Sequence, residues 1–211
     1  MIRKMLVVAV AIAMPVSVIA FTGATAGAKK GPSAKTDTAV CTNITGTVSF
    51  SIPLTNNGNT TGGIETSTVN ATVSGCTVSG TFPVTITSGT ISGTFAGKAG
   101  SAKHPSAQCT GLLGTSKNKG SVSTNWSSSP AVPPTTTSVK TVTGGTDGPN
   151  AQFQLNGSFK GSFGGADKGK SSSSRSDTVE TVAALAGECG GSGISTIHLK
   201  NPSSGAPLTL G

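Results

Sequence analysis

The sequence predicts a mainly β chain, folded as a single antiparallel β-barrel or tight β-sandwich with one short helix near the C-terminus. Apolar and polar residues alternate along many stretches, as in 44–54, and this period of two is typical of half-buried strands. The composition is dominated by Ser, Thr and Gly, which are poor helix formers, and no strand–helix–strand spacing is present. These observations together favour an antiparallel sheet.

Glycines interrupt the apolar faces of the predicted strands. In 153–163 the large apolar side chains point to one side of an extended chain, but Gly157 and Gly161 lie on the same side. Gly46 and Gly93 occupy similar positions. Such glycines favour a strongly bent sheet in which neighbouring backbones approach closely. The alternative is that they leave internal space for a small apolar ligand.

The alternation places the strands in order along the chain. The apolar phase changes from even to odd between Ile86 and Ile91, which predicts a bulge or kink within one bent strand. The Ser- and Pro-rich segments 127–138 and 171–174 resemble locally disordered chain. Strands are predicted over 44–54, 65–78, 82–95, 120–126, 136–143, 153–163, 194–199 and 207–210.

The segment 176–191 breaks the β pattern. Val182 and Leu185 fit the apolar face of a short helix, Ser176 or Asp177 is available as its N-cap, and glycines follow it. We therefore predict one helix within 176–191.

The N-terminus has the features of a secretory signal peptide: two basic residues, an apolar run and then small residues. We expect a signal peptide over 1–26, a flexible linker over 27–40 and one β domain over 41–211. Cleavage is expected after Ala26, with Ala28 as the alternative. An uncleaved membrane anchor is a second alternative, but Pro15 within the apolar run argues against it. The protein is thus expected to be secreted, without a transmembrane segment after cleavage.

The charge of the chain bears on its partners. Loss of Arg3 and Lys4 with the signal peptide leaves 13 basic residues against seven acidic ones, a net charge of +6. The lysines are scattered, with no dense run and no interleaved aromatic residues, which argues against nucleic-acid binding. A solvated basic surface or weak association with acidic envelope polymers fits this distribution.

The four cysteines lack metal-binding spacing, and in an exported chain they favour disulfides. If the turn after 44–54 is centred between Gly58 and Asn59, apolar residues of the two flanking strands face each other. The same register sets Cys41 opposite Cys76 on the polar side of the ribbon, at a Cα separation of about 4.5 to 5.5 Å that a disulfide spans. We predict the disulfide Cys41–Cys76, which leaves Cys109–Cys189 as the second.

No catalytic constellation is evident. His104 lies in a loop without a nearby carboxylate, and His198 occupies an exposed strand position. Hydrolase chemistry is disfavoured because the chain has no G-x-S-x-G motif, although serines and the acids Asp147, Asp167 and Asp177 are present. The acids lie singly, which disfavours a glycosidase, and Asp147 fits a turn. We expect no enzyme activity, no cofactor and no metal site.

Several short fragments in one order resemble a group of uncharacterised secreted actinomycete proteins. That resemblance covers nearly all of the chain after the signal peptide, and it implies export, a β-rich fold and paired cysteines. It supplies no catalytic residue. The fragments are FSIPL (50–54), GC (75–76), SGTF (92–95), CTGL (109–112), Trp126, GSFKGSF (157–163), LAGEC (185–189), GISTI (193–197) and LTLG (208–211).

Two functions follow as expectations. The first is a non-catalytic secreted or envelope-associated β protein that contacts a partner or polymer. The second is a carrier that holds a small apolar ligand inside the barrel. The first is favoured here, because bending alone accounts for the glycines. A secreted hydrolase requires His104 or His198 to lie beside both a serine and a carboxylate.

Overall fold

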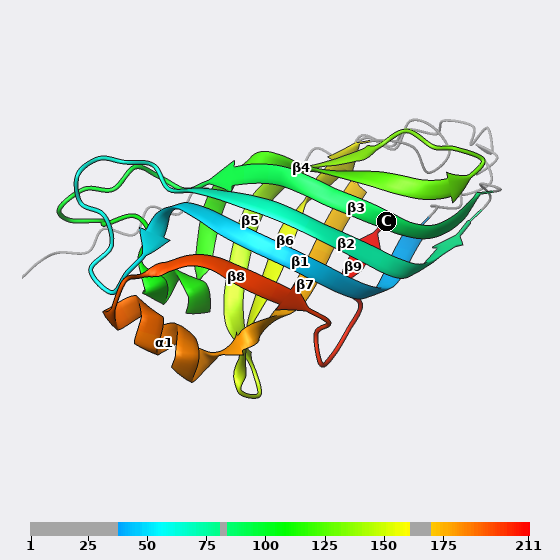
Figure 1. The fold of residues 1–211 in the computed structure, drawn as a ribbon. Helices are drawn as coiled ribbons and strands as arrows, with labels where there is room; N and C mark the ends of the chain where they lie inside the picture. Colours follow the sequence, from blue (N-terminus) through cyan, green and yellow to red (C-terminus); the bar gives the residue numbers. More distant parts are fainter. Residues whose placement is uncertain (1–37, 81–83, 161–169) are drawn as a thin grey trace, which may run out of the picture. The chain divides into compact units, whose positions relative to one another are not determined.

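The computed structural model describes residues 38–80, 84–160 and 170–211 (Figure 1). Eight antiparallel strands close into a barrel, with one extra short strand, so the predicted mainly β fold is confirmed as a barrel. The strands are β1 (Thr38–Leu54), β2 (Thr66–Ser79), β3 (Thr85–Ala96), β4 (Thr115–Ser129), β5 (Thr135–Asp147), β6 (Asn150–Lys160), β7 (Lys170–Thr181), β8 (Ile194–Lys200) and β9 (Leu208–Leu210), and the helices are η1 (Cys109–Leu113) and α1 (Val182–Gly190).

Strands β8 and β9 together fill the space between β7 and β1. Both pair antiparallel with β1, so they run in the same direction, and both also pair with β7. The loop 201–207 separates them. Asn201 accepts a hydrogen bond from the Ile44 N–H at 2.6 Å, and the buried Asp177 carboxylate accepts from the Ser203 N–H at 3.1 Å. These side chains satisfy backbone groups where the ladder is interrupted.

The predicted register of β1 and β2 is confirmed. Ile44 pairs with Val73, Val48 with Val69, and Cys41 with Cys76. The disulfides Cys41–Cys76 and Cys109–Cys189 are both present. The first joins Cα atoms 3.9 Å apart, closer than expected.

The expected face of the Cys41–Cys76 disulfide was wrong. Cys41 is fully buried and Cys76 nearly so, because the inward face changes phase between Cys41 and Ile44 on β1 and between Val73 and Cys76 on β2. On β2 this change occurs at Gly75, which has a φ of +62° that glycine adopts without strain. Both strands change phase together, so the register survives while the cysteines turn inward.

The glycines on the inward faces admit neighbouring backbone, as expected. A Cβ added at Gly46 would meet the Asn70 carbonyl, and one at Gly93 would meet the Ser121 carbonyl. Gly157 is similarly close to the Ser138 carbonyl. Gly161 lies outside the described residues. The predicted kink in β3 is confirmed by a register shift between Ile86 and Ser88 against β4.

Several expected boundaries differ from the structure. The helix begins at Val182 rather than near Ser176, because β7 continues to Thr181, whose hydroxyl caps the helix by accepting from the Ala184 N–H at 3.2 Å. The segment 171–174 belongs to β7, and Thr135 opens β5 within the segment expected to be disordered. Ser172 to Ser174 pair with β6 on one edge and with β9 on the other, so this stretch is ordered by strand pairing on both sides. The first residues of β1, Thr38 to Val40, fall within the expected linker. The expected signal peptide and the rest of the linker lie outside the described residues.

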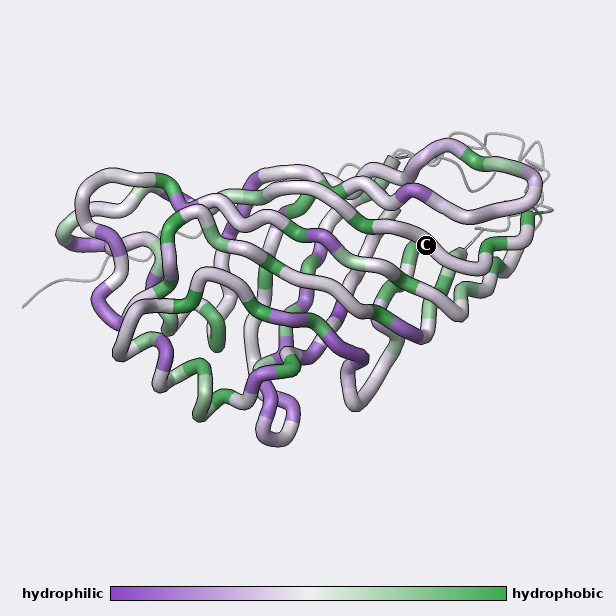
Figure 2. The backbone as a smooth tube through the Cα atoms, viewed as in Figure 1, coloured by the Kyte–Doolittle hydropathy of each residue, from purple (hydrophilic) through white to green (hydrophobic). Residues whose placement is uncertain are grey.

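The barrel interior is packed at one end. Fully buried side chains fill the end that contains the first residues of β1 and the last residue of β6, among them Val73, Phe159 and Leu210. The most hydrophilic residues are concentrated in the connecting loops and around β8 (Figure 2). The opposite end of the barrel contains the last residues of β1 and the first residues of β2. Its interior holds a cavity.

Candidate functional site

A cavity of about 770 Å³ occupies the half of the barrel near the end of β1 and the start of β2. Its wall is largely apolar and receives side chains from all of the strands β1 to β8. The apolar lining residues include Ile44, Val48, Val69, Ile91, Phe95, Val122, Val139, Phe153, Leu155, Ile197 and Leu199. The predicted inward face of 153–163 therefore supplies part of a cavity wall as well as part of the packed core.

One loop crosses this end of the barrel. Residues 97–114, here called the cap loop, line the cavity over most of their length and include η1. The cap loop exchanges two backbone hydrogen bonds between Ser106 and Asn59, at 2.6 and 2.9 Å, on the β1–β2 side. Further along, η1 contacts β5 and β6, on the opposite side of the barrel, and Gly144 donates to the Gly114 carbonyl at 2.7 Å. The cap loop thus spans the barrel end.

Two features fix the cap loop in place. The disulfide Cys109–Cys189 joins it to the last turn of α1. Ala107, which lines the cavity, has a φ of +53°, a left-handed conformation that costs a non-glycine residue about 1 kcal/mol or more. The hydrogen bonds from Thr55 to the Ala107 carbonyl, at 3.0 Å, and from Cys109 to the Thr55 carbonyl, at 3.1 Å, flank this residue. The connection between β1 and β2, expected as a hairpin turn, therefore also holds the cap loop.

Charged residues line the cavity only at the mouth. Lys98 and His104 lie on the cap loop and are exposed, so the cavity reaches the surface beside them. Glu65, just before β2, is partly buried and is the acidic residue in the lining. The buried Ser67 hydroxyl lies 3.1 and 3.3 Å from the two carboxylate oxygens of Glu65 and donates to them. Burial raises the pKa of the Glu65 carboxyl above its usual value, and the hydrogen bond from Ser67 offsets part of this rise.

The two histidines lie apart from each other in the fold. His104 belongs to the cavity mouth. The side chain of His198 is exposed, as expected, but its Nδ1 lies 2.5 Å from a carboxylate oxygen of Glu180, a partner the sequence did not indicate. Burial alone would raise the pKa of Glu180, but hydrogen bonds from the ring and N–H of His198 outweigh it and lower that pKa. Among the described residues no hydroxyl hydrogen-bonds to either imidazole ring.

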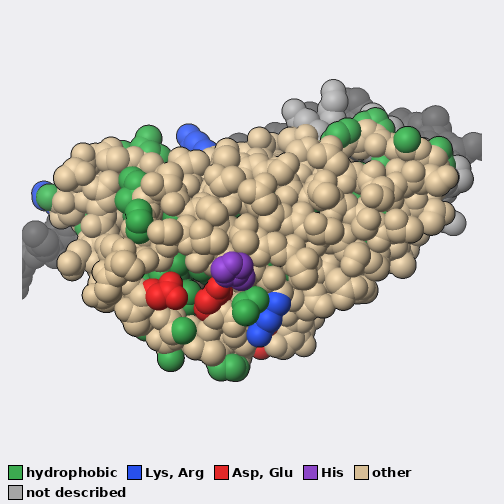
Figure 3. Space-filling model, viewed as in Figure 1, with side chains coloured by type: hydrophobic (Ala, Val, Ile, Leu, Met, Phe, Trp, Pro, Cys, Tyr) green, Lys and Arg blue, Asp and Glu red, His purple; other side chains and the backbone are tan. Residues whose placement is uncertain are grey.

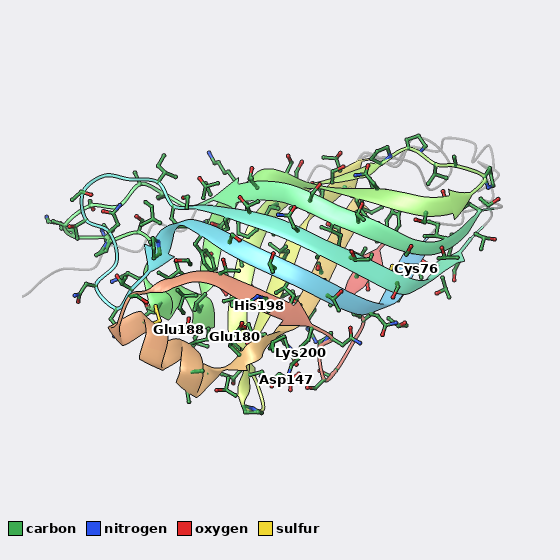
Figure 4. All side chains as sticks on the ribbon, in the orientation of Figure 1. Cys76, Asp147, Glu180, Glu188, His198 and Lys200 are labelled. Carbon is green, nitrogen blue, oxygen red and sulfur yellow. A yellow bond between two sulfur atoms is a disulfide. The ribbon has the colours of Figure 1, made fainter. Side chains whose placement is uncertain are left out.

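This pair lies on the outer surface of the barrel. Figure 4 labels Glu180, His198 and Lys200 close together beside β8. The acidic side chains visible on this face lie there and near α1, a few Lys or Arg side chains lie at its upper and left edges, and most of the face is uncharged (Figure 3). None of these three residues lines the cavity.

Two of the acids expected to lie singly share a partner. The Gln152 side-chain amide donates to Asp147 and to Asp177, at 3.0 Å in each case. Asp147 also ends β5 opposite Asn150, so its predicted place at a turn is confirmed. Neither acid lines the cavity. Asp177 instead accepts a hydrogen bond from the Ser203 N–H in the loop 201–207. Asp167 lies outside the described residues.

No group of three or more His, Cys, Asp or Glu side chains in the described residues is arranged to hold a metal ion. The same part of the chain contains no helix of the length and apolar character needed to cross a bilayer. No family model, curated protein or solved structure matches this chain. The candidate site is thus defined by its geometry: an apolar cavity with a partly buried carboxylate near its mouth.

Proposed function

We propose that this protein is a non-catalytic carrier that binds a small, largely apolar molecule inside the barrel. The observation that carries the proposal is the cavity of about 770 Å³. Ligand sites typically enclose about 300 to 1,000 Å³ and are lined mainly by apolar side chains with a few polar groups. The close-packed glycines do not create this space, because neighbouring backbone fills the positions of their missing side chains.

The packing of the barrel supports the same proposal. Protein interiors are normally filled to the density of organic crystals. Here the end around Val73 and Phe159 is filled, whereas the other end combines an apolar wall with a cap loop fixed by a disulfide. An alkyl chain buried in such a space gains about 0.8 kcal/mol for each methylene removed from water.

Calorimetric titration with dodecanol tests this proposal. Val139→Phe and Ala71→Leu each add volume to the cavity wall, and Ala184→Phe, at an exposed position on α1, is the matched control. We expect the wild type and the control to bind one dodecanol, and the two filled variants to bind at least about tenfold more weakly. Circular dichroism establishes that each variant is folded. Absence of binding to the wild type, or equal binding by folded filled variants, contradicts the proposal.

Association with the cell envelope is a second candidate, supported by the net charge of +6 expected after cleavage. Scattered lysines attract acidic polymers weakly, and salt screens that attraction. We expect partial sedimentation of the protein with isolated actinomycete envelope at low salt and its release at high salt. Recovery of all of the protein in the supernatant at low salt counts against this role. That sedimentation result does not test whether the cavity binds a ligand.

A further inference from the structure

We infer that the molecule bound in the cavity has a cationic head group, which the Glu65 carboxylate binds at the cavity mouth. This inference rests on the proposed carrier function and adds the chemical class of the ligand: an amphiphile with an apolar body and a protonated amine. Three observations support it, and a fourth, the presence of two basic residues at the mouth, is weighed against them.

The first observation is the position of Glu65. Glu65 lines the same cavity as apolar side chains of β2 and β3, such as Val69 and Phe95. An amphiphile with its alkyl chain in the apolar half can therefore bring its head group to Glu65 without leaving the cavity. The other acids of the described residues do not line this space.

The second observation is that Glu65 is held in place but incompletely paired. Ser67, only 4% exposed, donates to the carboxylate of Glu65, and its hydroxyl supplies a single proton. A carboxylate accepts about four hydrogen bonds. The ion pair found in the described residues joins Glu180 to His198, so Glu65 has no ion-pair partner among them. Its remaining acceptor capacity is available to a ligand.

The third observation concerns energy. A carboxylate that is partly removed from water and lacks a cation is destabilised. Burial indeed raises the pKa of Glu65. A bound ammonium group relieves this cost with charge-assisted hydrogen bonds, which are stronger than neutral ones. A ligand carboxylate in the same place would add like-charge repulsion.

The fourth observation concerns the two basic residues at the mouth. Lys98 and His104 both face the cavity from the cap loop, and they favour an anionic head group instead. Both residues are exposed, so water already solvates their charges. Glu65 is the more buried group, so water solvates its charge less, and it therefore gains more from a ligand of opposite charge.

Three probes with the same chain and different head groups test the inference: dodecylamine, dodecanol and dodecanoate. Each is titrated by calorimetry, below the concentration at which it forms micelles, into wild type, Glu65→Gln and Glu188→Gln. Glu188 is an exposed glutamate on α1 outside the cavity lining, so it is the matched control. Gln keeps the shape of Glu but removes its charge.

We expect wild type to bind dodecylamine most tightly and dodecanoate least. Glu65→Gln should bind dodecylamine about tenfold or more weakly than wild type does, because a hydrogen bond to a charged group is lost. The affinity of Glu65→Gln for dodecanol should differ from that of wild type by less than about threefold. Glu188→Gln should bind all three probes as tightly as wild type does. The unfolding temperature of Glu65→Gln checks that the variant is folded.

Two results overturn the inference while leaving the carrier proposal intact. One is that dodecanoate binds as tightly as dodecylamine, which assigns the head group to Lys98 or His104. The other is that dodecylamine binds folded Glu65→Gln as tightly as wild type. Failure of all three probes to bind the wild type overturns both proposals at once.

Discussion

Cys109 in η1 is bonded to Cys189 in the last turn of α1, and this disulfide joins the cap loop to the connection between β7 and β8. The two cysteines are 80 residues apart in sequence, and their Cα atoms are 6.2 Å apart. Backbone hydrogen bonds join the cap loop to Thr55 and Asn59 on the same side of the barrel, and on the opposite side the Gly144 N–H donates to the Gly114 carbonyl at 2.7 Å. The cavity is therefore partly covered by a segment that is fastened at both sides of the barrel.

Removal of this disulfide is expected to loosen the cap loop. For Cys109→Ser/Cys189→Ser, the chain-entropy treatment of a loop this long gives a loss of about 4 to 5 kcal/mol in the free energy of unfolding. Hydrogen exchange should accelerate most at the amides of 106–114, and release of dodecanol should become faster. Unchanged protection in 106–114, measured under conditions where the variant is folded, contradicts the role assigned to the disulfide.

The Cys41–Cys76 disulfide is expected to affect stability without affecting the cavity. It lies at the packed end of the barrel and closes a shorter segment, with a sequence separation of 35. For Cys41→Ala/Cys76→Ala we predict a loss of about 3 to 4 kcal/mol in the free energy of unfolding. The affinity of the folded variant for dodecanol should stay within about twofold of wild type. A comparable loss of affinity in both disulfide variants would show that the two ends of the barrel are not independent.

The sequence predicted those parts of the fold that depend on local pattern. Alternation in 44–54 and 65–78 allows one register that pairs apolar residues, so Ile44 opposite Val73 and the Cys41–Cys76 bridge followed from it. The inward turn of the cysteines did not, because it depends on the left-handed conformation at Gly75, which no periodicity indicates.

The site was less accessible to prediction. Glu65 was not singled out, since a lone glutamate before a strand has no distinctive sequence signal. The cavity depends on how far eight strands and the cap loop stand apart, and alternation specifies only which side chains point inward. The helix start was misplaced because Ser176 and Asp177 are good N-cap residues that β7 uses instead as buried strand residues.

Gly93 and Gly145 provide a matched test of close strand packing. A Cβ at Gly93 would meet the backbone of Ser121 and Val122, whereas nothing lies within 4 Å of one at Gly145. We predict that Gly93→Ala lowers the free energy of unfolding by about 1 to 3 kcal/mol through overpacking. Gly145→Ala should be neutral or stabilise by up to about 1 kcal/mol. Chemical denaturation measures both, and equal effects would contradict the close approach at Gly93.

Glu65 is expected to reduce stability at neutral pH. Its pKa in the folded protein is above the reference value of 4.5, so the folded state holds this proton more tightly than the unfolded state. The stability that protonation contributes is present below 4.5 and is lost as the pH rises through the folded pKa. Glu65→Gln should therefore unfold at a higher temperature than wild type at pH 7.

The difference in unfolding temperature between Glu65→Gln and wild type should become smaller as the pH falls toward 4.5. Lys98 and His104 also face the cavity, but both are present in the two proteins that are compared. Thermal unfolding in a series of buffers provides the comparison. A variant that is less stable than wild type at pH 7 would mean that Glu65 stabilises the fold, which removes the energetic argument for a cationic ligand.

The location of a bound chain tests the central claim most directly. We predict that nuclear Overhauser effects from the methylene protons of dodecanol reach the methyl groups of Val139, Leu155 and Ile197, which line the cavity from three separate strands. Ile64, Leu113 and Val179 are exposed and serve as the reference for surface binding. Contacts to all three inner residues place the chain inside the barrel, whereas contacts confined to the exposed residues, or none, contradict the account.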